Sequence, residues 1–257
     1  MGRVLVISSQ VASSRVGASA GRFVLERMGH EVVVLPTVLL GRHPGWGAPG
    51  GGAVSVERLR SMWTAIRKQE LHFDAVQTGY FANEDQVALA AEIIDQLRPG
   101  LVMVDPVIGD DDGMYVAERV AGAIRDELVP EADIITPNQW EHDWLTSTAP
   151  VPPGVTELVT SSPDGARIGA LYRDPDLALR VSHERFDAVP HGGGDTLAAL
   201  WLAHAMEGLP PPLNLARSTG SVLALLRASV ESDLGEIPLA RLQDKLFDPD
   251  PLEVTHV

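Results

Sequence analysis

Residues 101–110 read Leu-Val-Met-Val-Asp-Pro-Val-Ile-Gly-Asp, and this stretch decides the fold class. Its first four residues are continuously apolar, which is typical of a strand covered on both faces of a parallel sheet. Residues 4–8 (Val-Leu-Val-Ile-Ser) and 132–136 (Ala-Asp-Ile-Ile-Thr) are similar, largely apolar runs that end on a hydroxyl. Because such runs alternate with amphipathic helical patterns, the chain predicts βαβ units and a mostly parallel central sheet in an α/β fold.

The other elements follow the same alternation. The expected strands are residues 3–8, 31–36, 74–78, 100–105, 133–135, 155–160 and 167–172. The expected helices are residues 17–28, 54–69, 84–97, 116–127, 137–146, 195–207, 213–230 and 238–246. We therefore expect a single domain over residues 1–257 with right-handed crossovers. Residues 41–53 are rich in Gly and Pro and predict either a mobile flap or an ordinary loop.

Composition excludes several classes of function. The chain has 257 residues, a formal net charge of −15 and no cysteine, so disulfides, thiolate metal sites and a cysteine nucleophile are excluded. It lacks the long basic run of a nucleic-acid-binding protein. No run approaches the ~18 apolar residues of a membrane span, and residues 4–7 are too short for a signal-peptide core. We expect a cytoplasmic protein that binds neither nucleic acid nor membrane.

A glycine-rich motif, His191-Gly192-Gly193-Gly194-Asp195, precedes a strongly helical stretch. Glycines let backbone N–H groups approach a ligand closely, and a helix N-terminus favours anions. Asp195 falls at the N-cap or in the first turn of that helix. The motif therefore predicts an anion site with a carboxylate beside it, or simply a glycine turn followed by an ordinary capping aspartate.

Further polar residues follow the predicted strands, where ligands bind in open α/β sheets. Asp105 and Asp110 lie on either side of a turn, and such carboxylates can share Mg²⁺ with substrate phosphates, or merely cap the turn. Pro137 suits the first turn of a helix, from which Glu141 projects. Tyr80 at the end of residues 74–78 could stack on an aromatic substrate or pack in the core.

Each of these signals is weak alone, but their order is specific. The relevant segments are VISSQVASSRVG (6–17), TGY (78–80), DPVIGD (105–110), ADIITPNQWE (132–141) and GGGD (192–195). In this order the chain resembles the pyridoxal kinase family of the ribokinase-like superfamily, over nearly its whole length. The resemblance implies a ribokinase-like three-layer α/β/α sandwich, with residues 41–53 as a small flap over the substrate.

The resemblance also implies a function. A homodimer would use MgATP, with Mg²⁺ as cofactor, to phosphorylate the 5′-hydroxymethyl of a vitamin B6 vitamer (pyridoxal, pyridoxine or pyridoxamine). Asp195 would be the general base. The implied anion hole is Gly192, Gly193 and Gly194; the Mg²⁺ ligands, partly through water, are Asp105, Asp110 and Glu141; the nucleotide site combines Asn138 and Thr160 with Asp105 and Glu141; and the contacts to the pyridine ring are Ser9, His43 and Tyr80.

The chain departs from the family pattern mainly on the substrate side. Pro44 and Trp46 stand where the family has Thr and Tyr, and Gly193 replaces the Thr of its GTGD motif. Residues 13–15 replace a Gly-Tyr pair, and only residues 146–154 stand where the family has an additional helix. The residues that bind phosphate and Mg²⁺ are therefore expected to be retained, whereas the identity of the acceptor is less constrained.

Two alternatives remain open. One is a kinase for hydroxymethylpyrimidine or another small alcohol, which the Tyr80 motif and Asp195 disfavour. The other is a non-catalytic protein that binds a vitamer or a nucleotide. The changes at Pro44 and Gly193 motivate this alternative, and the retained Asp105 argues against it.

Overall fold

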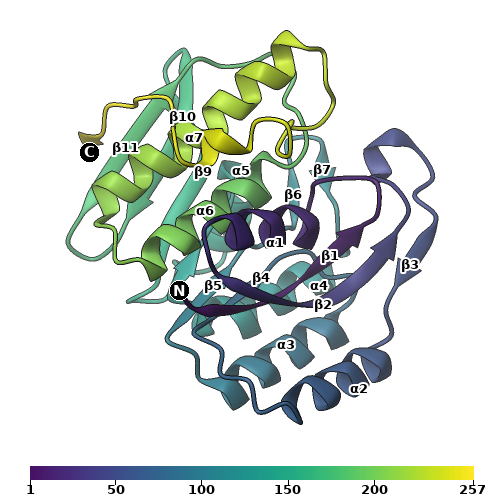
Figure 1. The fold of residues 1–257 in the computed structure, drawn as a ribbon. Helices are drawn as coiled ribbons and strands as arrows, with labels where there is room; N and C mark the ends of the chain where they lie inside the picture. The colour runs from purple at the N-terminus through teal and green to yellow at the C-terminus, as the bar shows by residue number, and fades with distance from the viewer.

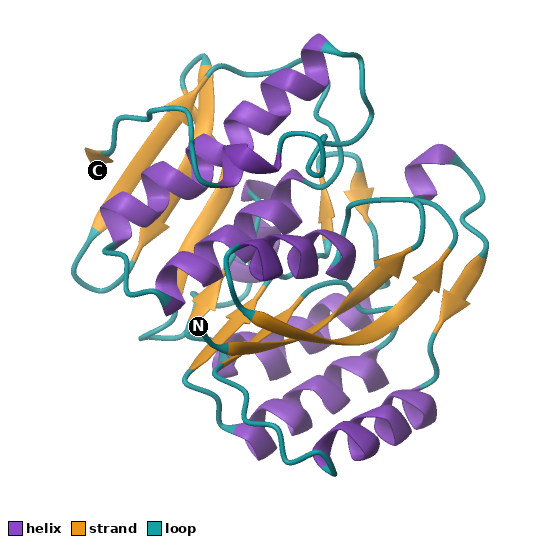
Figure 2. Cartoon of the chain, viewed as in Figure 1, coloured by secondary structure: helices purple, strands orange, loops and turns teal.

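The computed structural model describes residues 1–257 and consists of a central sheet between two layers of helices (Figure 1, Figure 2). The strands are β1 (Arg3–Val11), β2 (Glu31–Leu40), β3 (Gly51–Ala53), β4 (Ala75–Thr78), β5 (Leu101–Val104), β6 (Gly109–Asp110), β7 (Gly113–Met114), β8 (Ile134–Ile135), β9 (Thr156–Asp164), β10 (Arg167–Arg173), β11 (Ala178–His183) and β12 (Thr255–His256). The ten-stranded sheet has the order β12-β11-β10-β9-β8-β5-β4-β1-β2-β3, and β6 pairs with β7 alone. From β9 to β2 neighbouring strands are parallel, and antiparallel strands complete both sides.

Both helical layers pack on buried faces of the same strands. The helices are α1 (Ala18–Arg27), α2 (Val56–Arg67), α3 (Glu84–Leu97), α4 (Glu118–Ala123), α5 (Gln139–Thr146), α6 (Gly193–Met206) and α7 (Pro211–Glu231). In β1, Val4 and Val6 join the core under α1, α6 and α7, whereas Leu5 and Ile7 join the core under α2, α3 and α4. Alternation of side chains across a strand explains why this apolar run is continuous.

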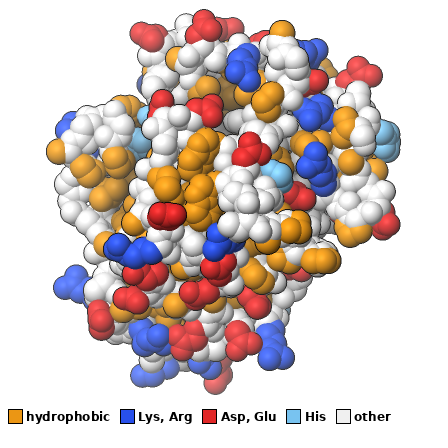
Figure 3. All heavy atoms as spheres, turned by 180° about the vertical axis from the view of Figure 1, so that it is seen from behind, with side chains coloured by type: hydrophobic (Ala, Val, Ile, Leu, Met, Phe, Trp, Pro, Cys, Tyr) orange, Lys and Arg blue, Asp and Glu red, His pale blue; other side chains and the backbone are white.

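The helices show no membrane-spanning segment, since none is both long and apolar enough. Figure 3 views the molecule from behind Figure 1 and shows acidic and basic side chains intermixed over its lower half. Among the ion pairs of the structure, Arg60 with Glu92 joins α2 to α3 at 2.8 Å. The negative net charge is therefore interrupted by basic groups on this face.

The expected fold class is confirmed, as are most of the expected helices and strands. The prediction of a helix over 238–246 is wrong: the only helical element there is the 3-10 helix η4 (Gln243–Leu246). Residues 238–242 form a single turn, in which the N–H of Leu242 donates to the carbonyl of Pro238 at 3.0 Å, and the preceding Ile237 donates its N–H to the carbonyl of His191 at 3.1 Å. The expected helix 116–127 is α4 followed by the π-helix η2 (Ile124–Leu128) and the 3-10 turn η3 (Val129–Glu131).

Two regions are more regular than expected. Strand β9 does not end at Thr160 but bulges there and continues, with Ser161 at a φ of 51°. Within residues 41–53 lie a 3-10 turn, η1 (Pro44–Trp46), and strand β3, which pairs antiparallel with the end of β2. Gly51 has a φ of 78°, and a Cβ there would lie 2.0 Å from the carbonyl oxygen of Leu39. Mobility of this segment stays a prediction.

Candidate active site

Two polar residues meet where β5 and β8 end at the same edge of the sheet. Asp105 follows β5 and Thr136 follows β8, and the Thr136 hydroxyl donates to the Asp105 carboxylate at 2.9 Å. Both side chains are buried. Because parallel neighbours align their carboxyl ends, residues 31 positions apart in the chain form one hydrogen-bonded pair.

Asp195 lies in the first turn of α6, whose N-cap is Gly192. Gly192 has a φ of 95°, and a Cβ there would lie 2.6 Å from the carbonyl oxygen of Arg15, so this turn requires glycine. The N–H groups of Gly193, Gly194 and Asp195 donate to no backbone carbonyl, and no side chain caps the helix. Free donors at a helix N-terminus make this turn suited to an anion.

The carboxylate of Asp195 acts on that of Asp105. Burial raises the pKa of Asp195 to about 6, while the backbone N–H of Gly17 acts in the opposite direction. The side chain of Asp195 keeps partial contact with solvent. Burial raises the pKa of Asp105 well above its usual value, and the charges of Asp195 and Glu141 raise it further. Like charges held this close favour a proton or a cation between them.

Glu141 is committed mainly to backbone groups. One oxygen accepts from the N–H of Ile108 at 2.8 Å and of Gly109 at 3.3 Å, and the other accepts from the N–H of Asn138 at 2.9 Å. The Asn138 side chain accepts in return from the N–H of Glu141, which completes a capping box at the start of α5. Burial raises the pKa of Glu141 to about 7, although these three donors oppose the shift.

Asp110 lies further out, in β6. Its carboxylate accepts from the Tyr115 hydroxyl and, at 2.9 Å, from the N–H of Asp112. No group of three or more His, Cys, Asp or Glu side chains in the structure is arranged to hold a metal ion directly. The charge of Asp110 nevertheless raises the pKa of Glu141, and the charge of Glu141 raises the pKa of Asp105. Such a donor set fits a hard cation that keeps much of its water, as Mg²⁺ does, rather than a closed protein cage.

Asn138 and Thr160 lie together, as expected. The N–H of Thr160 donates to the carbonyl of Pro137 at 2.8 Å, and Asn138 and Thr160 form an isolated parallel bridge. The Asn138 amide also donates to the carbonyl of Gly109 at 2.8 Å. These contacts join the start of α5, the bulge of β9 and the loop after β5 into one rigid rim.

Ser9 lies in β1 and Tyr80 directly follows the neighbouring strand β4, after Gly79. Gly17 has a φ of 55°, and a Cβ there would lie 2.2 Å from the Ser9 hydroxyl, so Ser9 packs against the residue whose N–H acts on Asp195. Tyr80 follows β4, the neighbour of β1, and its N–H donates to the Ser8 hydroxyl at 3.2 Å. Burial raises the pKa of Tyr80.

His43 makes different contacts. Its ring lies 4.0 Å, between centroids, from the ring of His191, and it makes no hydrogen bond with Ser9 or Tyr80. Burial lowers the pKa of His43, and His191 lowers it further, while Glu236 has the opposite effect. The structure thus places the predicted ring contacts in two groups, one on the strands and one on residues 41–53.

Two residues that contact predicted site residues were given no role by sequence reasoning. Gly17 was quoted only within the opening segment, and His191 only within the glycine-rich motif, whereas Thr136 was noted as a polar residue that ends a strand. A glycine at a left-handed φ or a ring contact between distant segments has no local signature in one sequence. Thr136 had such a signature, because it ends a strand as Asp105 does, and the structure pairs the two.

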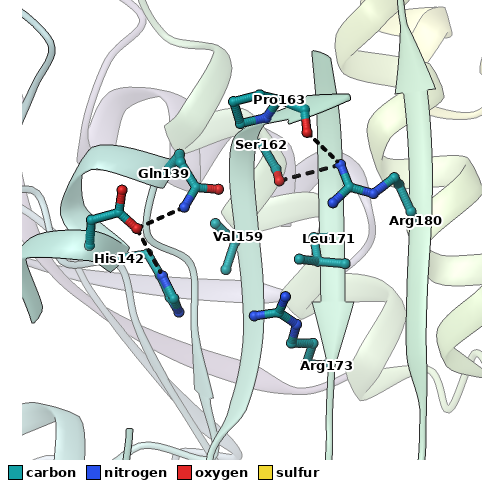
Figure 4. A pocket seen from close by; sticks show the side chains of 9 residues that line it. Gln139, His142, Val159, Ser162, Pro163, Leu171, Arg173 and Arg180 are labelled. Atoms are coloured by element: carbon teal, nitrogen blue, oxygen red, sulfur yellow. Dashed lines mark hydrogen bonds and ion pairs between the residues drawn. The ribbon is translucent and has the colours of Figure 1, made fainter. Parts of the chain in front are cut away.

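A separate hollow of about 400 Å³ lies between α5 and strands β9–β11. Figure 4 shows Arg180 reaching over it to the Ser162 hydroxyl and the Pro163 carbonyl. Its lining residues are Gln139, His142, Asp143, Val159, Ser162, Pro163, Leu171, Arg173 and Arg180. None of these is a predicted site residue, so the hollow is distinct from the candidate active site.

Comparisons with known proteins bear on the chemistry of this edge. Residues 53–157 match the family model described as phosphomethylpyrimidine kinase. The chain is 33% identical over 274 residues to the pyridoxal kinase PdxY of Leifsonia xyli subsp. xyli, covering 96% of each chain. It is 30% identical over 238 residues to the pyridoxal kinase of Homo sapiens, covering 78% of this chain and 76% of that one.

The solved structures with a similar fold include further pyridoxal kinases. The pyridoxal kinase of Leishmania donovani in complex with ADP and ginkgotoxin superimposes with a TM-score of 0.90 at 27% identity and covers 100% of both chains. The pyridoxal kinase of Entamoeba histolytica has a TM-score of 0.91 at 24% identity, which supports the fold alone. By its sequence relatives and its ribokinase-like fold, the chain belongs to the pyridoxal kinase family and is a phosphotransferase with an alcohol acceptor.

Proposed function

We propose that this protein transfers the γ-phosphoryl group of ATP to the 5′-hydroxymethyl of a vitamin B6 vitamer. Its relatives at 30% and 33% identity are named pyridoxal kinases, and one neighbour is a pyridoxal kinase in complex with ADP and pyridoxamine. The observation that carries the proposal is Asp195, a partly buried carboxylate in the same helical turn as free backbone N–H donors.

Asp195 acts as the general base that takes the proton from the hydroxymethyl oxygen as this oxygen attacks the γ-phosphorus. With a pKa of about 6 it is mostly ionised at neutral pH, yet its basicity is well matched to that proton transfer. The backbone N–H groups of Gly192, Gly193 and Gly194 form the anion hole over the phosphoryl oxygens. Positioning and charge stabilisation of this kind dominate phosphoryl transfer.

The nucleotide lies against the rim formed by Asn138 and Thr160, which contact the triphosphate. Bound Mg²⁺ would neutralise charge on the β- and γ-phosphate oxygens. Asp105, Asp110 and Glu141 would hold it, Asp105 being the nearest to Asp195 and Glu141 acting mainly through water. Support for this assignment is the set of raised carboxyl pKa values, which a cation would relieve.

The vitamer ring is framed by Ser9 and Tyr80 from the strands and by His43 from residues 41–53, which serve as a flap. Ser9 packs against Gly17, whose N–H acts on Asp195, so the ring and its hydroxymethyl are brought to the base together. Following the family, we also propose a homodimer and a cytoplasmic location. Analytical ultracentrifugation and cell fractionation test these two points.

The decisive experiment measures ADP release from MgATP with pyridoxal, pyridoxine and pyridoxamine, each with the wild type, Asp195→Asn and Asp187→Asn. We expect Asp195→Asn to fold, to bind MgATP and to lose kcat by about 10²–10⁴-fold, the usual contribution of a general base. Asparagine caps a helix as well as aspartate does, so a mere capping role predicts near-normal turnover. The exposed Asp187 is the matched control. Absence of turnover with all three vitamers in the wild type rejects the proposal.

One observation favours a second acceptor. Residues 53–157 match the phosphomethylpyrimidine kinase model, so hydroxymethylpyrimidine and its monophosphate belong in the same panel. Comparison of kcat/KM across the panel ranks the acceptors. A pyrimidine that exceeds every vitamer in kcat/KM would transfer the assignment to this alternative.

A further inference from the structure

The flap (residues 41–53) rests on the segment that leads into the glycine-rich turn. Three rings form the contact: His43 lies 4.0 Å from His191 between centroids, and Trp46 approaches both rings edge-on, with centroids 6.0 Å away. The 3-10 turn η1 positions the two flap rings, since the His43 ring accepts from the N–H of Gly45 at 3.1 Å. Figure 1 shows this turn beyond the ends of β2 and β3.

A glycine faces a ring on each side of this contact. A Cβ on Gly45 would lie 3.0 Å from ring nitrogens of both His191 and His43. A Cβ on Gly235 would lie 3.3 Å from the indole nitrogen of Trp46. The flap therefore lacks a side chain where it meets His191, and the opposing segment lacks one where it meets Trp46. Complementary absence of side chains on both surfaces lets the rings lie close together.

The segment beneath the flap is rigidly held. The backbone of His191 donates to Gly235 at 3.0 Å and accepts from Ile237 at 3.1 Å. The Ser229 hydroxyl, near the end of α7, donates at 2.9 Å to the carbonyl of Glu236. This segment lies directly before Gly192 and Asp195. A flap that rests on it therefore has a fixed position relative to the turn that holds Asp195.

Glu236 extends the same support to the first loop. Its carboxylate accepts from the N–H of Arg15 at 2.6 Å, and the carbonyl of Arg15 lies against Gly192. The other oxygen of Glu236 is buried without a partner. One short segment therefore contacts the first loop, the glycine-rich turn and the flap at once.

We propose that His191 is a positioning residue that latches the flap, through His43 and Trp46, onto the fixed segment before the catalytic turn. This contact, which we call the latch, holds the flap on that segment in the absence of substrate. The flap therefore loses less conformational freedom when the acceptor binds. The effect on the acceptor rests on the proposed function, whereas the latch itself does not.

The latch is tested first without any turnover. Trypsin cleavage after Arg42, an exposed flap residue, reports how often the flap detaches from the segment around His191. We expect His191→Ala and Gly45→Ala to accelerate this cleavage about two- to tenfold, the range for loss of one aromatic contact. Gly52→Ala is the matched control, because it adds the same methyl group to the flap where nothing lies within 4 Å. Circular dichroism checks that each variant is folded.

The second readout is kinetic. With the best acceptor of the panel, we expect His191→Ala to raise the KM for the acceptor about two- to tenfold while kcat changes less than about twofold, since bound substrate still closes the flap. Unchanged cleavage in both His191→Ala and Gly45→Ala overturns the latch. Faster cleavage in an enzyme without vitamer turnover would reject the proposed function and leave the latch standing.

Discussion

Asp195 must be charged to act as a base, yet it is held where charge is unfavourable. Burial raises its pKa to about 6. A base works in its ionised form, so kcat is expected to rise as pH increases through about 6 and to level off above it. The profile of kcat at saturating substrates from about pH 5 to about pH 8.5 measures this. A profile without an acid limb near that value would contradict the assignment.

The same raised pKa has a consequence for stability. An ordinary aspartate titrates near about 3.9, so the ionised Asp195 destabilises the folded state above its folded pKa of about 6. The destabilisation disappears below about pH 4, where the carboxyl is neutral in both states. We expect Asp195→Asn to be more stable than the wild type by about 1–2 kcal/mol at about pH 8, with the difference lost near pH 4. Urea unfolding at both pH values measures it, and a less stable variant at the higher pH would refute it.

At the residue scale, local motifs identified the candidate carboxylates but not the effect of one carboxylate on the pKa of another. Asp105 and Asp195 were both recognised from their own turns, but the effect of Asp195 on the pKa of Asp105 depends on the spatial approach of segments far apart in the chain. Glu141 was expected as a metal ligand, whereas its observed contacts are three backbone N–H groups, of which only that of Asn138 belongs to the capping box. The pattern of Asn138 and Glu141 three residues apart is itself a capping signature, so this part was available in the sequence.

Helix α5 depends on that capping box. Removing the Glu141 side chain leaves the N–H groups of Asn138, Ile108 and Gly109 without their acceptor. We expect Glu141→Ala to lower the free energy of unfolding by about 2–4 kcal/mol without nucleotide or Mg²⁺. Glu253→Ala, at an exposed position, is the control. A loss seen only when MgATP is present would instead favour a pure ligand role.

A second contact ties α5 to β9. His142 lies 2.7 Å from the Glu157 carboxylate, with side chains only 15% and 18% exposed. Glu157 raises the pKa of His142, so the pair stabilises fully below the unfolded-state value of about 6.5 and loses this contribution as pH rises through the raised folded-state value. We expect Glu157→Gln to cost about 1 kcal/mol at about pH 6 and much less at about pH 9, measured by urea unfolding. An equal loss at both pH values would mean that the charge is irrelevant.

At the element scale, strongly periodic segments were predictable and short ones were not. Helix α3 has the predicted bounds, 84–97, because Asn83 caps it and its apolar face repeats regularly. Strands β3 and β12 span three and two residues, too few for any period to appear. Residues 238–246 have a helix-like composition, but the preceding Ile237 is bonded to the backbone of His191, Leu239 is buried, and the first part of the segment forms a turn instead of a helix.

For the whole molecule we expect one cooperative unfolding transition, as a single domain requires. Strand β1 contributes Val6 to one core and Ile7 to the other. Both helical layers therefore lose their packing surface when this strand unfolds. Trp201 lies in the first core and Trp63 in the second. Fluorescence of Trp201→Phe and Trp63→Phe during urea unfolding should give coincident midpoints that match far-UV circular dichroism. Separated midpoints would indicate two independent units.

The shortness of the outermost strands limits how copies of this protein can assemble. The sheet is bounded by β3, Gly51–Ala53, and by β12, Thr255–His256. Such short strands offer few unpaired backbone groups to an incoming chain, so extension of one sheet into another is poorly templated at either end. A homodimer of this protein must therefore join through side chains on its helices or loops, and concentrated solutions should resist growth into β-rich fibres.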